Sequence, residues 1–236
     1  MGGVKRTIFI TGTDTGVGKT VLTALLAEHF RAQGVSVAAL KPVCSGGRGD
    51  ARILHAALDG TLTLDAINPW HFRAPIAPIL AARREKRVLR LAPVLAHIRS
   101  VQKRFAVTLV EGAGGVLSPL GEDFNSRDLI RALGAVPVIV APNRLGVVNH
   151  VLMTIEALPK QARARARVVL MMALERDAAT ASNQGLLEHY TGRRLWPVPR
   201  LGRAFRWRQA IQASSVGRKV ADLAAAILEV PGPAGK

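Results

Sequence analysis

The chain of 236 residues is poor in cysteine, in acidic side chains and in long apolar runs. Its single cysteine, Cys44, excludes an intrachain disulfide and is typical of proteins that work in a reducing cytosol. No apolar stretch is long enough to span a membrane, and no signal peptide is apparent before the first predicted strand. We therefore expect a cytoplasmic protein with no membrane partner.

The scarcity of acids leaves 33 lysines and arginines against 16 aspartates and glutamates, a formal net charge of +17. Such an excess is compatible with a polyanionic partner such as nucleic acid. However, the sequence has no zinc-finger spacing and no aromatic RNA-binding signature, and aromatic residues make up only 4% of it. We therefore expect a solvated, arginine-rich surface that attracts small anions, and we do not expect nucleic-acid binding.

A hydrophobic content of 49% excludes a disordered chain, and the length suits one α/β domain with a sizeable core. Apolar, β-prone runs alternate with segments of helical spacing along the whole chain. Strands are predicted at 6–12, 35–40, 105–111, 136–141, 167–173 and near Trp196. Helices are predicted at 19–33, 50–58, 78–86, 92–104, 125–133, 146–158, 182–190 and 216–228, and residues 59–78 are predicted to be mostly loop.

The predicted strands are too uniformly apolar for a sheet with one face in water. They predict a parallel sheet that is covered by helices on both faces. No repeat or linker divides the chain, so we expect a single domain over 1–236, with a short basic Pro/Gly tail from about residue 230. Ligands of such sheets bind at the carboxyl edge of the strands, so functional side chains are expected just after strand ends.

A glycine-rich stretch joins the first predicted strand to the first helix and ends in Gly18-Lys19-Thr20. Strand, glycine turn and helix start in this order wrap backbone N–H groups around nucleotide phosphates, aided by the positive end of the helix. Lys19 would reach the terminal phosphates, and the Thr20 hydroxyl would bind Mg²⁺. The loop is a variant, because Thr13 stands where common loops have their first glycine and Gly12 lies one residue earlier.

Three charged side chains follow other predicted strands or open a helix: Lys41, Asp50 and Glu111. Glu111 closes an apolar strand and is well placed to hold Mg²⁺, since the glycine-rich run 112–115 leaves the backbone bare for a ligand. Lys41, held by Pro42, is suited to clamp developing negative charge. The alternatives are a capping or surface acid for Glu111, a helix N-cap for Asp50 and a solvated strand-end lysine for Lys41.

Smaller residues near Lys41 are less specific. Ser45 is suited either to bond a substrate or to form a turn. Cys44 is expected to be a small core or loop residue, because no histidine lies at nucleophilic spacing from it. His71 and His150 are interpreted as ordinary residues of a loop and of a helix start.

Four motifs follow one another along the chain: Gly-Thr-Asp-Thr-Gly-Val-Gly-Lys-Thr at 12–20, Lys-Pro-Val-Cys-Ser-Gly at 41–46, Val-Glu-Gly-Ala-Gly-Gly at 110–115 and Leu-Gly-Val-Val-Asn-His at 145–150. Together with Asn68-Pro69-Trp70, Pro75 and Ala77-Pro78, they resemble the dethiobiotin synthetase family, over roughly residues 6–201. The resemblance implies a single-domain P-loop NTPase-type fold, with a parallel β-sheet flanked by helices on both faces.

The resemblance also implies an ATP-dependent ligase that forms dethiobiotin, ADP and phosphate from 7,8-diaminopelargonate, a late step of biotin synthesis. One amine takes up CO₂ (from bicarbonate) as a carbamate. The carbamate then accepts the γ-phosphate as a carbamic–phosphoric anhydride, and the second amine closes the ureido ring. Two lysines and Mg²⁺ would supply the charge neutralisation that phosphoryl transfer needs. The family further implies a homodimer with its active site at the interface.

By the same resemblance, catalytic roles fall to Lys41, Lys19 and Thr15, and the metal ligands are Thr20, Asp50 and Glu111. The nucleotide-binding set is Gly16, Val17, Gly18, Lys19, Thr20, Val21, Asp50, Glu111, Gly112, Ala113, Gly114, Pro199, Arg200 and Leu201. The substrate-binding set is Ser45, Thr15, Gly146, Val147 and Asn149, the last three at a helix start that binds the substrate carboxylate across the dimer interface.

The chain departs from the family pattern on the adenine side. Many members have Asn-Asp just after the strand at 167–173, where the asparagine reads adenine, and this chain has Ala173-Leu174. Arg200 stands where an aromatic residue can occur, and Ile79 stands where a histidine may follow the mid-chain proline. We therefore predict a weakened preference for ATP over other nucleoside triphosphates.

Two other functions are alternatives to the synthetase. A partitioning-type ATPase switch is disfavoured by Asp14, which stands where those proteins carry a signature lysine. A related amide-forming P-loop ligase is disfavoured in its self-sufficient form, because the chain has no room for a glutaminase domain and shows no Cys–His nucleophile pair.

Overall fold

A computed structural model describes residues 5–173, 175, 177–199, 201 and 214–230. Its main feature is a six-stranded sheet in the order β2-β5-β1-β6-β7-β8, in which every neighbouring pair is parallel. The strands are β1 (Arg6–Gly12), β2 (Val37–Leu40), β5 (Val107–Gly115), β6 (Val136–Pro142), β7 (Arg167–Met171) and β8 (Leu195–Val198). The predicted parallel sheet is therefore confirmed.

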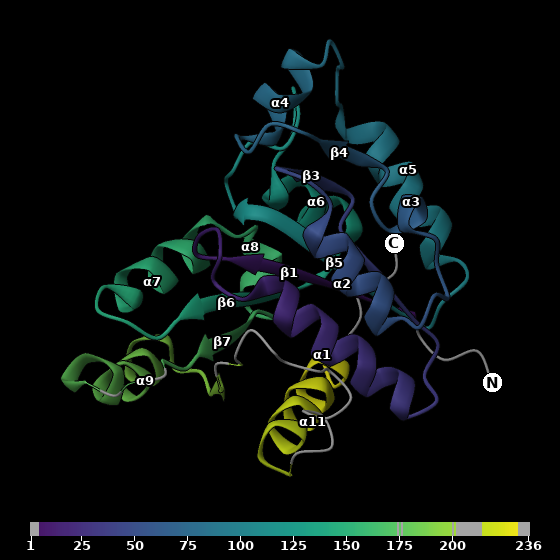
Figure 1. Ribbon diagram of the computed structural model, residues 1–236. Coiled ribbons are helices and arrows are strands. Elements are labelled where there is room, and N and C mark those ends of the chain that lie inside the picture. The colour runs from purple at the N-terminus through teal and green to yellow at the C-terminus, as the bar shows by residue number, and fades with distance from the viewer. Residues whose placement is uncertain (1–4, 174, 176, 200, 202–213, 231–236) are drawn as a thin grey trace.

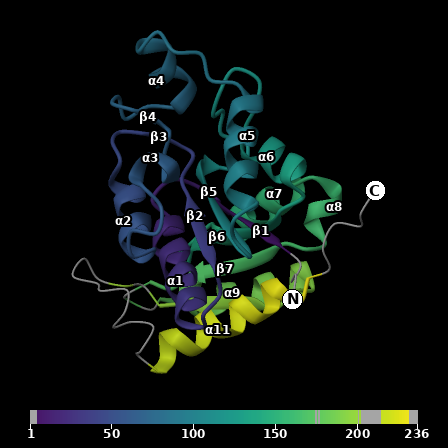
Figure 2. The ribbon, with the colours of Figure 1, turned by 90° about the vertical axis from the view of Figure 1, so that its right-hand side faces the viewer.

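Helices cover both faces of this sheet, as Figures 1 and 2 show. The first two helices lie on one face and the middle helices on the other, while the last helix packs against α1 and β8. The helices are α1 (Lys19–Ala32), α2 (Gly49–Ala57), α3 (Leu64–Ile67), α4 (Pro78–Arg84), α5 (Leu91–Gln102), α6 (Ser126–Leu133), α7 (Val147–Ala157), α8 (Lys160–Arg163), α9 (Ala178–Thr191) and α11 (Ser214–Leu228).

The core explains why the strands read as uniformly apolar. Ile8, Phe9 and Ile10 of β1 are fully buried, although successive side chains of a strand point to opposite faces. Both faces of the sheet are thus shielded from water, as parallel sheets require. Within the described ranges, no helix is long and apolar enough to cross a membrane.

Two helices begin at capping boxes in which a side chain and a backbone N–H bond each other reciprocally. At α6, Asn125 accepts from the Asp128 N–H and Asp128 accepts from the Asn125 N–H, at 3.2 and 3.0 Å. Asp177 and Thr180 form the same arrangement at α9. This cap starts α9 at Ala178, so the predicted start at 182 was wrong by one turn.

The prediction of mostly loop at 59–78 was also incomplete. This segment holds α3 and a short strand, β4 (Trp70–Phe72), which pairs in parallel with β3 (Val43–Ser45). Three-residue strands are too short to show a hydrophobic period, so they could not be predicted from the sequence. His71 lies in β4 rather than in a loop, and Cys44 and Ser45 of β3 line the main cavity of the protein.

Strand β5 is longer than predicted. It continues past Glu111 to Gly115, which pairs with Gly12 of β1 across a local irregularity. The glycine-rich segment is therefore part of the sheet and not a bare loop. Leu174, Arg200 and the expected tail from 231 lie outside the described residues.

Candidate active site at the carboxyl edge of the sheet

A cavity of about 800 Å³ opens at the carboxyl ends of β1, β2 and β5. Most of the predicted site residues line it: Thr15, Gly16, Gly18, Lys19, Thr20, Val21, Lys41, Ser45, Asp50, Glu111, Ala113 and Gly114. Others do not: Val17, Gly112, Pro199, Leu201, Gly146, Val147 and Asn149. The fold thus brings together residues from three of the four motifs, together with Asp50, as expected for this edge of a parallel sheet.

The loop between β1 and α1 has the backbone geometry of an anion cradle. Gly16 and Gly18 have φ values of 67° and 103°, which residues with a Cβ rarely adopt. Gly18 is the N-cap of α1, and within the described chain no side chain caps this helix and no acid lies in its first turn. The N–H groups and the positive end of α1 are therefore available to a phosphate.

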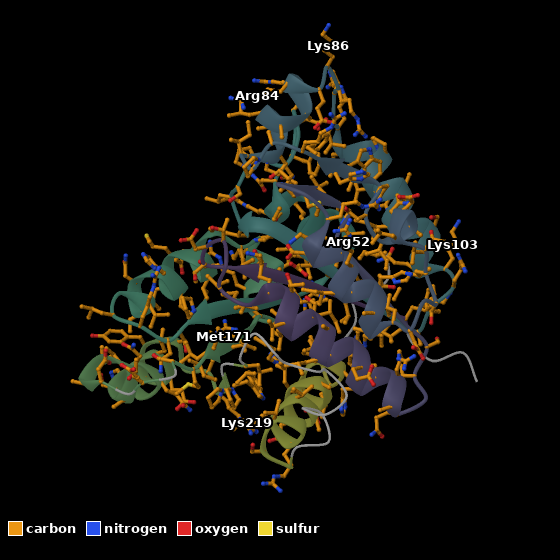
Figure 3. All side chains as sticks on the ribbon, in the orientation of Figure 1. Arg52, Arg84, Lys86, Lys103, Met171 and Lys219 are labelled. Atoms are coloured by element: carbon orange, nitrogen blue, oxygen red, sulfur yellow. The ribbon has the colours of Figure 1, made fainter. Side chains whose placement is uncertain are left out.

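Met171, at the end of β7, lies close to this loop. A Cβ on Gly18 would come within 3.0 Å of the Met171 side chain, which Figure 3 labels near the centre of the molecule. Similarly, a Cβ on Gly12 would come within 2.7 Å of Val17. A side chain at Gly12 would therefore force Val17 to move, which explains why this variant loop has a glycine at position 12.

Lys19 is buried at the start of α1, with 6% of its surface exposed. Its ammonium group donates to the backbone oxygen of Asp14 at 2.7 Å. Burial, followed by repulsion from Lys41, lowers the pKa of Lys19 to about 8. A lysine with this shifted pKa lacks a strong anionic partner, which the phosphates of a nucleotide would provide.

Lys41 occupies the centre of a buried ionic cluster. Its Nζ lies 2.6 Å from Glu111 Oε1 and 2.9 Å from Asp50 Oδ2, and it donates to the Gly112 carbonyl at 3.1 Å. Burial works to lower the pKa of Lys41, but the two carboxylates outweigh burial and raise it above its ordinary value. Since the whole residue is only 3% exposed, the alternative of a solvated strand-end lysine is excluded.

The two acids of this cluster also depart from their alternative interpretations. Arg48 is the N-cap of α2, so Asp50 lies inside the first turn and is not the cap. Burial works to raise the pKa of Asp50, but Lys41 and a hydrogen bond from Thr20 keep it below its ordinary value. Glu111 is 1% exposed and is therefore not a surface acid.

The oxygens around this cluster fit a magnesium ion. Thr20 donates to Glu111 Oε1 at 2.8 Å, while Glu111 Oε2 is buried and has no hydrogen-bond partner among the described residues. In the described part of the chain, no three or more histidine, cysteine or acidic side chains are grouped so that they could hold a metal ion. Two carboxylates and a hydroxyl, completed by water and phosphate, are the usual ligands of Mg²⁺ in nucleotide sites.

Sequence reasoning missed Asn68 as part of the site. Asn68 is fully buried, donates to the Lys41 carbonyl at 2.6 Å and accepts from the Cys44 thiol at 3.2 Å. Burial raises the pKa of Cys44, which supports its interpretation as an unreactive small residue. Ser45 donates to the Ile76 carbonyl at 2.6 Å and so holds the 75–78 segment against the cavity.

A second, shallower hollow of about 460 Å³ lies beside the first, near α7. Ser118 lines both hollows and had no signal in the sequence. His150, in the first turn of α7, and Met153 also line this second hollow. Gly146 and Asn149 are exposed at the start of α7, next to Leu145, which is 83% exposed.

The parallel sheet, the phosphate-type loop at α1 and the lysine–carboxylate cluster define a nucleotide-binding protein of the P-loop class. A family model described as an AAA domain matches residues 6–204. Among solved structures, the MinD cell division protein of Aquifex aeolicus aligns with a TM-score of 0.60 over 98% of this chain and 100% of that chain. Its sequence identity is 13%, so this likeness establishes the fold alone.

Sequence relatives define the family more narrowly. The ATP-dependent dethiobiotin synthetase of Anaeromyxobacter sp. (strain Fw109-5) is 41% identical over 201 residues, which cover 83% of this chain and 89% of the relative. The enzyme of Anaeromyxobacter dehalogenans (strain 2CP-1) is 44% identical over 70% of this chain and 76% of its own length. The enzyme of Methanocaldococcus jannaschii is 41% identical over 64% and 72%. The chain belongs to the dethiobiotin synthetase family, which confirms the resemblance seen in its motifs.

Proposed function

We propose that this protein is an ATP-dependent dethiobiotin synthetase, which closes the ureido ring of 7,8-diaminopelargonate with CO₂. The observation that carries the proposal is the convergence of Lys19, Lys41 and Glu111 with the phosphate loop in one cavity. This cavity belongs to a chain that is 41% identical to a synthetase over 201 residues. The partitioning-type switch has only the distant fold likeness in its favour.

The residues suit the charge changes of the reaction. The N–H groups of the loop and the Lys19 ammonium would hold the phosphates, and Lys41 would neutralise the carbamate as it approaches the γ-phosphate. Mg²⁺, held by Thr20, Asp50 and Glu111, would supply further positive charge to the phosphate oxygens. Because both lysines are buried, little water competes with the transferring group, which strengthens each of these interactions.

Thr15 and Ser45 belong to two different motifs but line the same cavity. We propose that they contact the carbamate or the diamine. The Ser45 hydroxyl already donates to the Ile76 carbonyl, which fixes its position. Thr15 is exposed, and its N–H is bonded by the Asp14 carboxylate at 2.6 Å. Substrate is expected to replace solvent at Thr15 without disturbing the loop backbone.

We infer that the enzyme acts as a homodimer. Gly146, Val147 and Asn149 do not line the main cavity of their own chain, although the family resemblance assigns them to the substrate carboxylate. Leu117, Leu145 and Met153 expose large apolar side chains beside them, at 53%, 83% and 53%. A second copy docked on this face would cover the apolar side chains and bring the start of α7 to its partner's substrate.

The decisive assay measures phosphate release from ATP in the presence of Mg²⁺ and bicarbonate, with and without 7,8-diaminopelargonate. Release should depend on the diamine, and mass spectrometry should find dethiobiotin in equal amount. Phosphate release that ignores the diamine would contradict the synthetase. The same preparation, studied by light scattering, tests the dimer independently of turnover.

A location in the reducing cytosol remains our prediction from the single cysteine.

A further inference from the structure

The Lys41 ammonium group lies where a cation bridging Asp50 and Glu111 would lie. It donates to Glu111 Oε1 at 2.6 Å and to the Gly112 carbonyl at 3.1 Å, and it forms an ion pair with Asp50 Oδ2 at 2.9 Å. Only 4% of the Lys41 side chain and none of the Glu111 side chain is exposed. In this arrangement Lys41 has no hydrogen left to donate to a substrate.

The backbone of Lys41 is fixed on both sides. Its N–H donates to the Ile67 carbonyl at 3.0 Å, and its carbonyl accepts from Asn68 at 2.6 Å. Any change that frees the ammonium group for catalysis must therefore be a rotation of the side chain about a stationary backbone. The side chain lines the main cavity, so such a rotation has space to turn into.

The proposed metal ligands are the same groups that hold Lys41. Thr20 and Lys41 both donate to Glu111 Oε1, and Asp50 completes the ring. An ion that bridges Asp50 Oδ2 and Glu111 Oε1 beside Thr20 would take the oxygens that Lys41 now contacts. A divalent ion and an ammonium group repel strongly at this separation in a buried site, so both cannot stay between the two carboxylates.

We propose that Lys41 is a built-in counter-ion of the metal site. In the metal-free protein its ammonium group holds Asp50 and Glu111 together, and on metal binding it gives up these bonds and turns into the cavity. Lys41 would then become available to the reacting groups only after a metal has replaced it. This inference rests on the metal ligands of the proposed function, and its tests separate the two.

The first test measures Mn²⁺ binding by calorimetry to the wild type and to Lys41→Met, alone and with the β,γ-imido analogue of ATP. Lys41→Met keeps the length of the side chain and removes its charge, so Mn²⁺ no longer has to displace an ammonium group. We expect Mn²⁺ to bind the variant about tenfold tighter, or more. Metal-free Lys41→Met should melt several degrees below the wild type, and Mn²⁺ should restore most of the loss.

Two variants serve as controls for this comparison. Lys103→Met makes the same change on the exposed surface, at the end of α5, where Figure 3 labels Lys103, and should leave Mn²⁺ affinity unchanged. Lys19→Met removes a nearby cation whose ammonium group bonds the Asp14 carbonyl and not a carboxylate. Without nucleotide it should tighten Mn²⁺ binding less than Lys41→Met, because it reports only the general loss of positive charge.

The second test follows the lysine itself. Buried ammonium groups give resolved ¹⁵N–¹H signals, and the Lys41 signal is the one that Lys41→Met lacks. Saturating Mg²⁺ with the imido analogue should shift this signal strongly or abolish it through exchange with water.

The outcomes divide cleanly. Equal Mn²⁺ affinity in wild type and Lys41→Met, or an unmoved Lys41 signal at saturating Mg²⁺, would mean that the metal uses the unpaired Glu111 Oε2 beside a stationary lysine. That result would overturn the counter-ion and leave the metal site standing. No Mn²⁺ binding to any of the proteins, with or without nucleotide, would overturn the metal ligands and the counter-ion together.

Discussion

The carboxyl edge of the sheet has two halves that are built differently. At the ends of β1, β2 and β5, charged side chains are buried and bonded to one another, as in the cluster of Lys41, Asp50 and Glu111. At the ends of β7 and β8, the described residues include Met171, Ala173, Pro199 and Leu201, which are apolar. The first half is lined by buried charged side chains, whereas the described residues of the second half are mainly apolar.

Even the buried amides near the second half are already engaged. Asn183 donates to Asn143 at 2.9 Å, and Asn143 donates to the Thr180 carbonyl at 2.8 Å. These bonds hold α9 against the end of β6 and leave the amides little capacity for a ligand. Under the proposed function, buried charge would bind the phosphates and the metal, while the described residues at the ends of β7 and β8 offer few polar groups to contact the base.

The largest expected effect is on catalysis at the charged half. Lys41→Ala should lower kcat by about 10²–10³, because a preorganised charge at the transferring group contributes that much to rate. Affinity for the imido analogue of ATP should change little, since the phosphate loop is intact. Steady-state kinetics and calorimetry measure the two quantities, and Lys103→Ala is the surface control. Unaltered turnover would remove Lys41 from the catalytic residues.

The next effect is on stability and separates the two acids of the cluster. In metal-free protein, Glu111→Gln should lower the free energy of unfolding by about 3 kcal/mol, because it leaves the buried Lys41 with a poorer partner. Asp50→Asn should cost only about 1 kcal/mol, since the Asp50 side chain is 48% exposed and its pairing is screened by water. Urea unfolding measures both. Equal losses would show that the cluster is not anchored at Glu111.

A third prediction concerns pH. The pKa of Lys19 is about 8 in the folded protein, below its ordinary value of 10.5, so between these values the unfolded chain binds more protons. The stability of the wild type should therefore rise with pH over this window relative to Lys19→Met, by roughly 1–3 kcal/mol. Below pH 8 the wild type bears the full cost of its buried charge. Parallel stability curves for wild type and variant would contradict the shift.

The smallest effect is expected at the apolar half. The wild type should use ATP, GTP and CTP with kcat/KM values within about tenfold of one another, since no strong base contact is expected. Ala173→Asn should favour ATP by roughly fivefold, which corresponds to one new hydrogen bond of about 1 kcal/mol. A nucleotide panel measures both proteins. Sharp ATP selectivity in the wild type would contradict the expected lack of a strong base contact in the apolar half.

The parts of the fold that have a strong local sequence signal could be predicted from the sequence. The apolar strands at 6–12 and 136–141 and the glycine loop at Gly18 have strong local signals, so their positions and the parallel sheet were correct. The β3–β4 pair was missed because each strand has three residues. Asn68 and Ser118 were missed as site residues because their roles arise only from tertiary contacts, with Lys41 and with the cavity wall.

The basic composition was interpreted as a solvated surface, and the structure places much of it there. Arg84, Lys86 and Lys103 are exposed and lie at the periphery in Figure 3. Few of these charges belong to the catalytic cluster, whose cations are Lys19 and Lys41. The sequence could not show whether Lys41 is solvated or buried. That depends on the position of Glu111, which the pairing of the strands determines.

The register of β1 has a consequence for how the protein is made. Gly12, at the root of the phosphate loop, pairs with Gly115 on one side and Val140 on the other. The ribosome must therefore add more than a hundred residues before the first strand has both its neighbours, a wait of roughly 6–25 s at usual rates of synthesis. Until β5 has been made, the apolar segment Ile8 to Ile10 has neither of its neighbouring strands. A ligand of the phosphate loop therefore cannot assist folding before β5 and β6 have been made.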